Sequence, residues 1–405
     1  MDINWFDLNI EDSISDYEFT RFAVLELNRI ISAEEFEKMD AGMIFQYLSG
    51  EMRIVRFNDF LKRYIYEKAQ FDVPFETITD KEFAQIIVSS FVENNVPFAF
   101  VEKQGRNSSK VRKWLKRETV KRETIFLLGF GLKMSDADVS EFLTKVIQED
   151  DFDFFSAKET CFWYCYRHGL SYSKAMSFLE YADRCDKDQT DRITSGVSFE
   201  KANVNPKLYL LTEDMLRSRL RQLKEHSVEE KRAETKTRRF RKLYDRVCQI
   251  IARHYNEYAQ ETKSNRVWKP EDIKPADIEE SLCSGIPKGN NGNLQKMSAS
   301  VLSDQFRNKR MDRQRISRLL SGKEDIGRFD LITMLFYIYA EEVEPNWPVE
   351  RYLQFVEEAN NMLKECDMMG IYPVNPYESF VMMCLVTDGP LDVYSEVFER
   401  SFERN

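Results

Sequence analysis

The sequence predicts an all-α, multi-lobed fold, and three observations support this prediction. Apolar residues recur at helical spacing along much of the chain, and few runs alternate in the way that strands require. Glycine and proline, which interrupt helices, number only 14 and 11 among 405 residues. Such breakers gather in residues 183–206 and 264–293, so we expect these two stretches to be flexible linkers.

The linkers and the helical patterns divide the chain into four predicted segments. A chain of 405 residues is long enough for several lobes with their own cores. We expect an N-terminal helical module (1–100), a second helical module (101–185), a basic helical connector with flexible linkers (186–299) and a C-terminal helical module (300–405).

Composition narrows the class of protein. The sequence contains no run of 18 apolar residues, and its first residues carry acids where a secretion signal needs basic ones. We therefore expect a cytoplasmic protein with no membrane partner. Seven cysteines form no C-x-x-C pair and there are only three histidines, so the sequence predicts neither a metal site nor a cofactor.

A possible internal repeat links the two ends of the chain. Residues 48–57 (LSGEMRIVRF) and 320–329 (LSGKEDIGRF) share six letters in ten. Three apolar residues at i, i+3 and i+4 lead into each copy, and Gly50 and Gly322 are predicted to end the two helices. The apolar residues are Ile44, Tyr47 and Leu48 in the first copy and Ile316, Leu319 and Leu320 in the last.

A third copy is predicted at residues 108–132, where Val111, Trp114 and Leu115 form the same apolar triplet. An arginine follows the triplet at a similar distance in all three copies, at Arg56, Arg122 and Arg328. A second feature recurs in the middle and last copies, where one glutamate precedes a cysteine by the same interval, in the pairs Glu159 with Cys165 and Glu378 with Cys384. The alternative interpretation is that amphipathic helices simply look alike.

The last copy, residues 313–339, resembles the second half of the lambda repressor-like helix-turn-helix domain, and residues 104–133 resemble it more weakly. The residues that match the family pattern are Ile316, Ser317, Arg318, Gly322, Lys323 and Leu331. Residues 301–311, where the preceding helix should lie, depart from that pattern. The resemblance implies that the helix at 312–320 lies in a DNA major groove, with its polar face toward base edges and phosphates.

Positive charge is concentrated in three segments, although the whole chain carries a net charge of −10. Residues 103–122 carry +8, residues 217–246 carry +7 and residues 307–323 carry +6. The first and third segments coincide with the middle and last copies of the predicted repeat, which favours contact with nucleic acid. The predicted DNA-binding residues are Lys110, Arg112, Lys113, Lys116, Arg313, Arg315 and Arg318.

The last copy allows a local prediction that a structure can test. Residues 313–320 should form a helix in which Ile316 and Leu320 are buried while Arg313 and Arg315 are exposed. Basic side chains that flank an apolar stripe in this way would be free to bind phosphates.

These patterns favour a non-enzymatic DNA-binding protein that regulates transcription, and no catalytic residue is predicted. One alternative is a helical interaction or effector scaffold that binds a protein partner or a second copy of itself. Another is a ribonuclease of the HEPN type, because Arg221 and His226 match its R-x4-H pattern. Cys161 and Cys165 lie one helical turn apart among aromatic residues, so we expect buried, unreactive thiols there.

Overall fold

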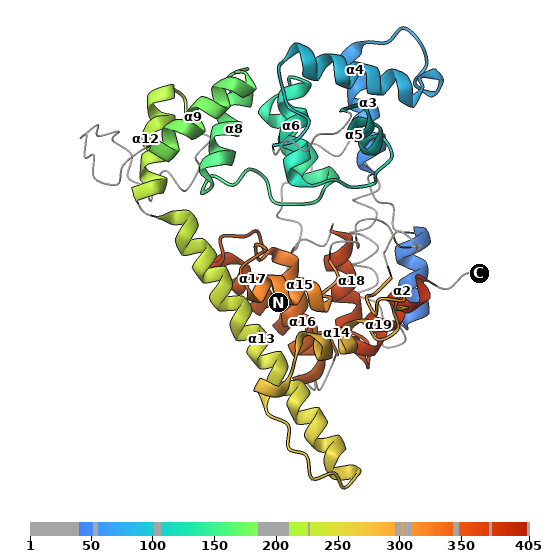
Figure 1. The fold of residues 1–405 in the computed structure, drawn as a ribbon. Coiled ribbons are helices and arrows are strands. Elements are labelled where there is room, and N and C mark those ends of the chain that lie inside the picture. The colour runs from blue at the N-terminus through green and yellow to red at the C-terminus, as the bar shows by residue number, and fades with distance from the viewer. Residues whose placement is uncertain are drawn as a thin grey trace. The chain divides into compact units, whose positions relative to one another are not determined.

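A computed structural model describes the fold of the chain (Figure 1). The described residues are 40–51, 56–100, 107–184, 210–225, 227–295, 302, 306, 309–342, 348–371 and 375–402. Almost all of them that belong to regular structure are helical, and an isolated bridge between Lys288 and Leu294 is the β-type pairing recorded among them. The prediction of an all-α fold is confirmed.

The chain forms two compact units. Unit 1 combines residues 1–54 with residues 233–405, and unit 2 comprises residues 55–232. This division differs from the four segments predicted from the sequence, because residues 56–100 belong to the same unit as residues 107–184. Within the described part of the chain, no helix is both long enough and apolar enough to cross a membrane.

Unit 2 is built around aromatic side chains. The ring of Phe162 lies 5.5 Å from that of Phe126 and 5.2 Å from that of Phe130, and the buried hydroxyl of Tyr166 donates to the Phe126 carbonyl at 2.7 Å. In Figure 1, α4 packs against α5, and α8 lies beside α9 and α12. The elements of unit 2 are α3 (Phe57–Ala69), η3 (Phe75–Thr77), α4 (Asp80–Glu93), α5 (Asn107–Trp114), α6 (Arg122–Gly131), α7 (Asp136–Glu141), η4 (Phe142–Val146), α8 (Ala157–Arg167), α9 (Tyr172–Arg184) and α12 (Glu213–Glu225).

Unit 1 places the apolar stripe of its longest helix, α13, in a second core. Phe240, Leu243, Val247, Ile250 and Ile251 are all buried there, as their spacing predicts. The elements of unit 1 are α2 (Ala41–Gln46), η2 (Tyr47–Glu51), α13 (Val228–Glu261, which begins in unit 2), η5 (Pro270–Asp272), α14 (Pro275–Cys283), α15 (Arg313–Leu320), α16 (Arg328–Glu342), α17 (Pro348–Glu365), α18 (Pro376–Leu385) and α19 (Pro390–Arg400).

The two predicted linkers have different outcomes. Residues 185–206 of the first lie outside the described residues. The prediction is wrong for the second, because residues 275–283 form α14, whose Ile278 and Leu282 are fully buried. Proline interrupts a helix only in its interior, whereas Pro275 occupies the first turn of α14, where its missing N–H has no helical partner to lose.

The two glycines predicted to end helices also differ. Gly322 has a φ of 67° and follows the capping residue of α15, so the predicted left-handed stop is confirmed there. Gly50 lies inside the π-helical turn η2, and the predicted stop after the first copy is wrong. Ala41, Ile44, Tyr47 and Leu48 nevertheless pack into the core of unit 1, where α2 lies against α19.

Among the described residues, each unit contains a bidentate arginine–glutamate pair, which we call its clasp; the pair is part-buried in unit 2 and buried in unit 1. In unit 2, Arg122 at the start of α6 binds Glu159 in the first turn of α8, with Nε to Oε1 at 2.8 Å and Nη2 to Oε2 at 2.6 Å. In unit 1, Arg328 at the start of α16 binds Glu378 in the first turn of α18, with the same atoms paired at 2.9 and 3.0 Å. Bidentate pairs of this kind fix both the distance and the angle between two helices.

Both clasp arginines also bind backbone carbonyls at the same chain positions relative to the glutamate. Nη1 and Nη2 of Arg122 donate to the carbonyls of residues 150 and 151, nine and eight residues before Glu159. Nη1 and Nη2 of Arg328 donate to the carbonyls of residues 369 and 370, again nine and eight residues before Glu378. The two clasps therefore join three corresponding segments of chain in each unit.

Candidate nucleic-acid interface

Helix α5 in unit 2 is held in place by one apolar face. Val111, Trp114 and Leu115 are buried, as the triplet predicts. Trp114 packs against two aromatic rings, with centroids 5.8 Å from Phe91 and 6.4 Å from Phe98. The side chains on the opposite face of α5 are therefore turned away from the core, and they are the basic ones.

The turn after α5 is fixed by the start of α3. The backbone N–H groups of Phe57 and Asn58 donate to the carbonyls of Glu118 and Arg117 at 2.8 and 3.1 Å. These bonds satisfy N–H groups that have no partner within α3 and anchor residues 117 and 118 beside it. They also bring exposed Arg56, which precedes α3, close to the turn, where its Nε lies 3.5 Å from Glu118 Oε1.

The resulting basic face consists of Arg56, Arg112, Lys113, Lys116 and Arg117, all exposed. Among the described residues, no ion pair is recorded for the last four of these side chains. Sequence reasoning predicted Arg112, Lys113 and Lys116, but it missed Arg56, because the backbone contact that places it spans about sixty residues of sequence and has no local pattern. Lys110, also predicted, is only half-exposed.

The arginines of helix α15 in unit 1 are paired with carboxylates, unlike the basic side chains that the structure describes on α5. The helix occupies residues 313–320 and buries Ile316, as predicted. Leu320, which was also predicted to be buried, is only half-buried, and Leu319 is buried. Arg315, however, donates from Nε and Nη2 to the two carboxylate oxygens of Asp330 at 2.6 and 2.9 Å. Its side chain is 19% exposed and that of Asp330 only 2%, so the prediction of an exposed Arg315 is wrong.

The other two predicted arginines of α15 also have carboxylate partners. Arg313 binds the buried carboxylate of Glu279 in α14 at 2.6 Å and is half-exposed rather than free. Arg318 donates to Glu324 at 2.7 Å. Burial opposes the charge of Arg315, yet the hydrogen bonds and negative charge of Asp330 raise its pKa above the ordinary value. All three guanidinium groups are therefore hydrogen-bonded to carboxylates of their own unit.

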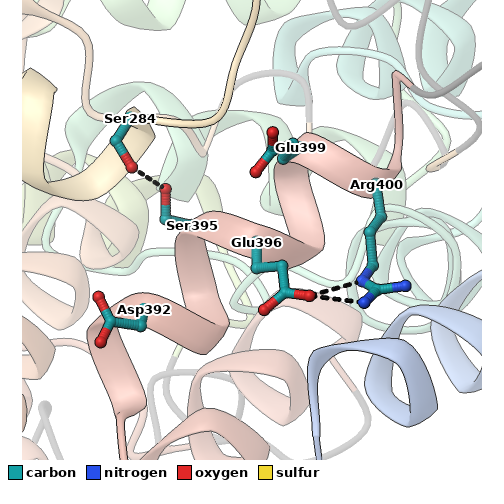
Figure 2. A pocket seen from close by; sticks show the side chains of 6 residues that line it. All are labelled: Ser284, Asp392, Ser395, Glu396, Glu399 and Arg400. Atoms are coloured by element: carbon teal, nitrogen blue, oxygen red, sulfur yellow. Dashed lines mark hydrogen bonds and ion pairs between the residues drawn. The ribbon is translucent and has the colours of Figure 1, made fainter.

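A polar hollow of about 320 Å³ lies in unit 1, where the end of α14 meets α19 (Figure 2). The hydroxyls of Ser284 and Ser395 lie 2.8 Å apart, and Arg400 binds Glu396 at 2.6 Å. Within the described residues, no three or more His, Cys, Asp or Glu side chains are grouped so as to hold a metal ion. The lining residues are Ser284, Asp392, Ser395, Glu396, Glu399 and Arg400.

The described residues add no support to the catalytic alternative. His226 of the R-x4-H pattern lies outside the described residues, and the Nε of Arg221 donates to the Tyr181 hydroxyl at 2.6 Å. Cys161 and Cys165 are fully buried, as predicted, and burial raises the pKa of the Cys165 thiol to about 12. A thiol with so high a pKa is a poor nucleophile at neutral pH.

The helix expected immediately before α15 falls on residues 301–311, which are described only in part. The described positions there, residues 302, 306 and 309–311, are not in an α-helix.

Comparisons of the chain with models of protein families, with curated proteins and with solved structures found no match. The resemblance to the lambda repressor-like domain therefore stays a prediction.

The packing that holds α5 in place can be tested at Gly131, the last residue of α6, because Gly131 lies against Phe91 and Phe91 packs against Trp114 of α5. A Cβ at this position would lie 2.0–2.5 Å from ring atoms of Phe91, which is buried and packs against Phe98 and Trp114. We expect Gly131→Ala to lower the free energy of unfolding by about 1–3 kcal/mol, as measured by denaturant titration. Gly289→Ala, whose Cβ would meet nothing closer than 3.5 Å, serves as the control; equal stability of the two variants would contradict this packing.

Proposed function

We propose that the protein is a non-enzymatic, nucleic-acid-binding regulator and that the basic face of unit 2 is its contact surface. One observation carries this proposal. The arginines of α15 are bound to carboxylates of their own unit, whereas Arg112, Lys113, Lys116 and Arg117 are exposed with no recorded ion pair among the described residues. Free cations that flank one another on a fixed surface are what phosphate binding requires.

We further infer that the two units are copies of one helical module, and the two clasps are the main support for this inference. Arg122 and Arg328 occupy corresponding positions in the predicted repeat, and so do Glu159 and Glu378. Each clasp joins one of these arginines to one of these glutamates. A chance likeness of amphipathic helices explains apolar spacing, but it gives no reason for matching bidentate pairs and matching carbonyl contacts.

The burial patterns of other helices agree with this duplication. Phe83, Ala84, Ile87 and Phe91 of α4 have the same spacing as Ile278, Glu279, Leu282 and Ile286 at α14, and all eight are buried. The three buried residues of α9 have the same spacing as two buried residues of α19 and the buried residue that follows this helix. These are Ala175, Phe178 and Ala182 in α9 and Tyr394, Val397 and Ser401 in the α19 region.

The correspondence also relates residues of α5 to the paired arginines of α15. In the matching spacing, Lys110 takes the place of Arg315, and Thr124 takes the place of its partner Asp330. Likewise Ala84 stands where the last copy has Glu279, the partner of Arg313. Ser108 stands where the last copy has Arg313, so of these two arginine positions the middle copy keeps a positive charge only at Lys110, and there it lacks the acid that pairs with the counterpart in the last copy.

The proposed contact can be measured through its salt dependence. Each phosphate contact that a duplex loses reduces the slope of log affinity against log salt by about 0.9. We therefore expect R112A/K113A/K116A to bind DNA more weakly and to flatten this slope by up to about 2.7, in fluorescence anisotropy titrations. The variant should stay folded, because these side chains lie outside the core.

The matched control removes the same charge elsewhere. Lys263, Arg266 and Lys269 are exposed in unit 1, and K263A/R266A/K269A should leave the slope unchanged. If wild-type protein has no DNA affinity at about 50 mM salt, where phosphate-contacting proteins bind strongly, the proposal fails and the scaffold alternative takes its place. We also propose a cytoplasmic location, in keeping with the buried thiols of the described cysteines.

A further inference from the structure

We propose that the ligand of the basic face is the sugar-phosphate backbone of a nucleic-acid double helix, bound without preference for sequence. This inference rests on the proposed function and names its substrate class. Three observations support it: the aromatic rings that pack against α5 are buried, the cations lie at the C-terminal end of α5, and these cations are close together in the chain.

The described aromatic rings that pack against α5 are buried. Phe91, Phe98 and Trp114 are buried against one another, with the Phe91 and Phe98 centroids only 4.8 Å apart. Proteins that bind single strands combine cations with exposed aromatic side chains, on which unpaired bases stack. The exposed described residues of α5 and the following turn are Ser109, Arg112, Lys113, Lys116 and Arg117, and none can provide such a platform.

The cations also occupy the wrong end of α5 for reading bases. A recognition helix contacts base edges mainly through its N-terminal residues. Here Arg112 and Lys113 lie in the last turn of α5, and Lys116 and Arg117 lie beyond it. The bonds from Phe57 and Asn58 hold this basic turn against α3. Cations fixed on a turn contact the backbone of a duplex more readily than the floor of its groove.

Charge density separates a duplex from a single strand. Residues 112–117 place four cations within six consecutive positions of the chain. A duplex carries one negative charge per about 1.7 Å of its axis, twice the density along either of its strands. A rigid cluster of closely spaced cations therefore releases more counterions from a duplex than from one strand.

The test compares five ligands in anisotropy titrations with full-length protein. These are two unrelated DNA duplexes of about 20 base pairs, roughly two helical turns, one single strand from each duplex, and an RNA duplex. We expect the two DNA duplexes to bind within about threefold of each other, since one base-reading contact discriminates by roughly fivefold or more. Each single strand should bind at least about tenfold more weakly, with a salt slope reduced toward about 0.7 per contact.

The outcomes separate this inference from the proposed function. Binding of a single strand as tightly as its duplex, or a preference of about tenfold or more for one DNA sequence, overturns the inference while leaving nucleic-acid binding intact. Lack of binding to all five ligands overturns the proposed function itself. Comparable affinity for the RNA duplex supports a backbone reader of either nucleic acid, and loss of RNA binding alone identifies the DNA duplex as the source. R112A/K113A/K116A should weaken both DNA duplexes by the same factor, and unequal losses would indicate base reading.

Discussion

Replacing Arg328 by methionine should lower the free energy of unfolding by about 3–5 kcal/mol, the effect expected when one partner of a buried ion pair is removed. The Glu378 side chain is only 1% exposed, and Arg328 supplies two of its hydrogen bonds. The same substitution removes the donor to the carbonyls of residues 369 and 370. The loss should appear as a lower denaturant midpoint in a titration followed by circular dichroism.

A second substitution shows whether the buried charge is the cause. In R328M/E378Q the remaining partner is neutral, so part of the lost stability should return. Arg184→Ala is the control, because its pair with Glu180 is largely exposed and such pairs contribute little. If R328M is as stable as R184A, the clasp does not stabilise unit 1.

Features that depend on local chemistry could be predicted from the sequence. The bounds of α15 follow from one apolar triplet and one glycine, Gly322, and the core of α13 follows from its stripe. In the same way, exposed Arg112 and Lys113 follow from their positions off the stripe of α5. Each of these features depends on residues within about two helical turns of one another.

Features that depend on distant partners could not be predicted. Counting charge treats every arginine as free, but Arg313 is bound by Glu279, 34 residues earlier, and Arg315 by Asp330, 15 residues later. Helix α14 could not be predicted because the residues around it are rich in glycine, asparagine and proline, which are typical of loops. Its Pro275 nevertheless lies in the first turn, where helices accept proline. The sequence shows that the clasp arginines recur and that the clasp glutamates recur, but it does not show that each arginine binds a glutamate.

The arginines of α15 provide the last prediction, which separates structural cations from binding ones. Arg315→Ala should lower the free energy of unfolding by about 3 kcal/mol, because it leaves the buried carboxylate of Asp330 without its guanidinium. The expected loss is at the lower end for a buried pair, since the Gly327 N–H still donates to Asp330 at 2.8 Å. Denaturant unfolding measures this loss.

A matched experiment compares a triple variant of α15 with a triple variant of α5, and measures both stability and DNA affinity. Where it remains folded, R313A/R315A/R318A should keep the wild-type DNA affinity and salt slope, because carboxylates already occupy these guanidinium groups. R112A/K113A/K116A should show the opposite behaviour, with wild-type stability and a flattened slope. Both triple variants remove three positive charges, so a general effect of net charge predicts equal losses of affinity. Equal losses, or a larger loss in the α15 variant, would mean that phosphates displace the carboxylate partners and that α15 belongs to the interface.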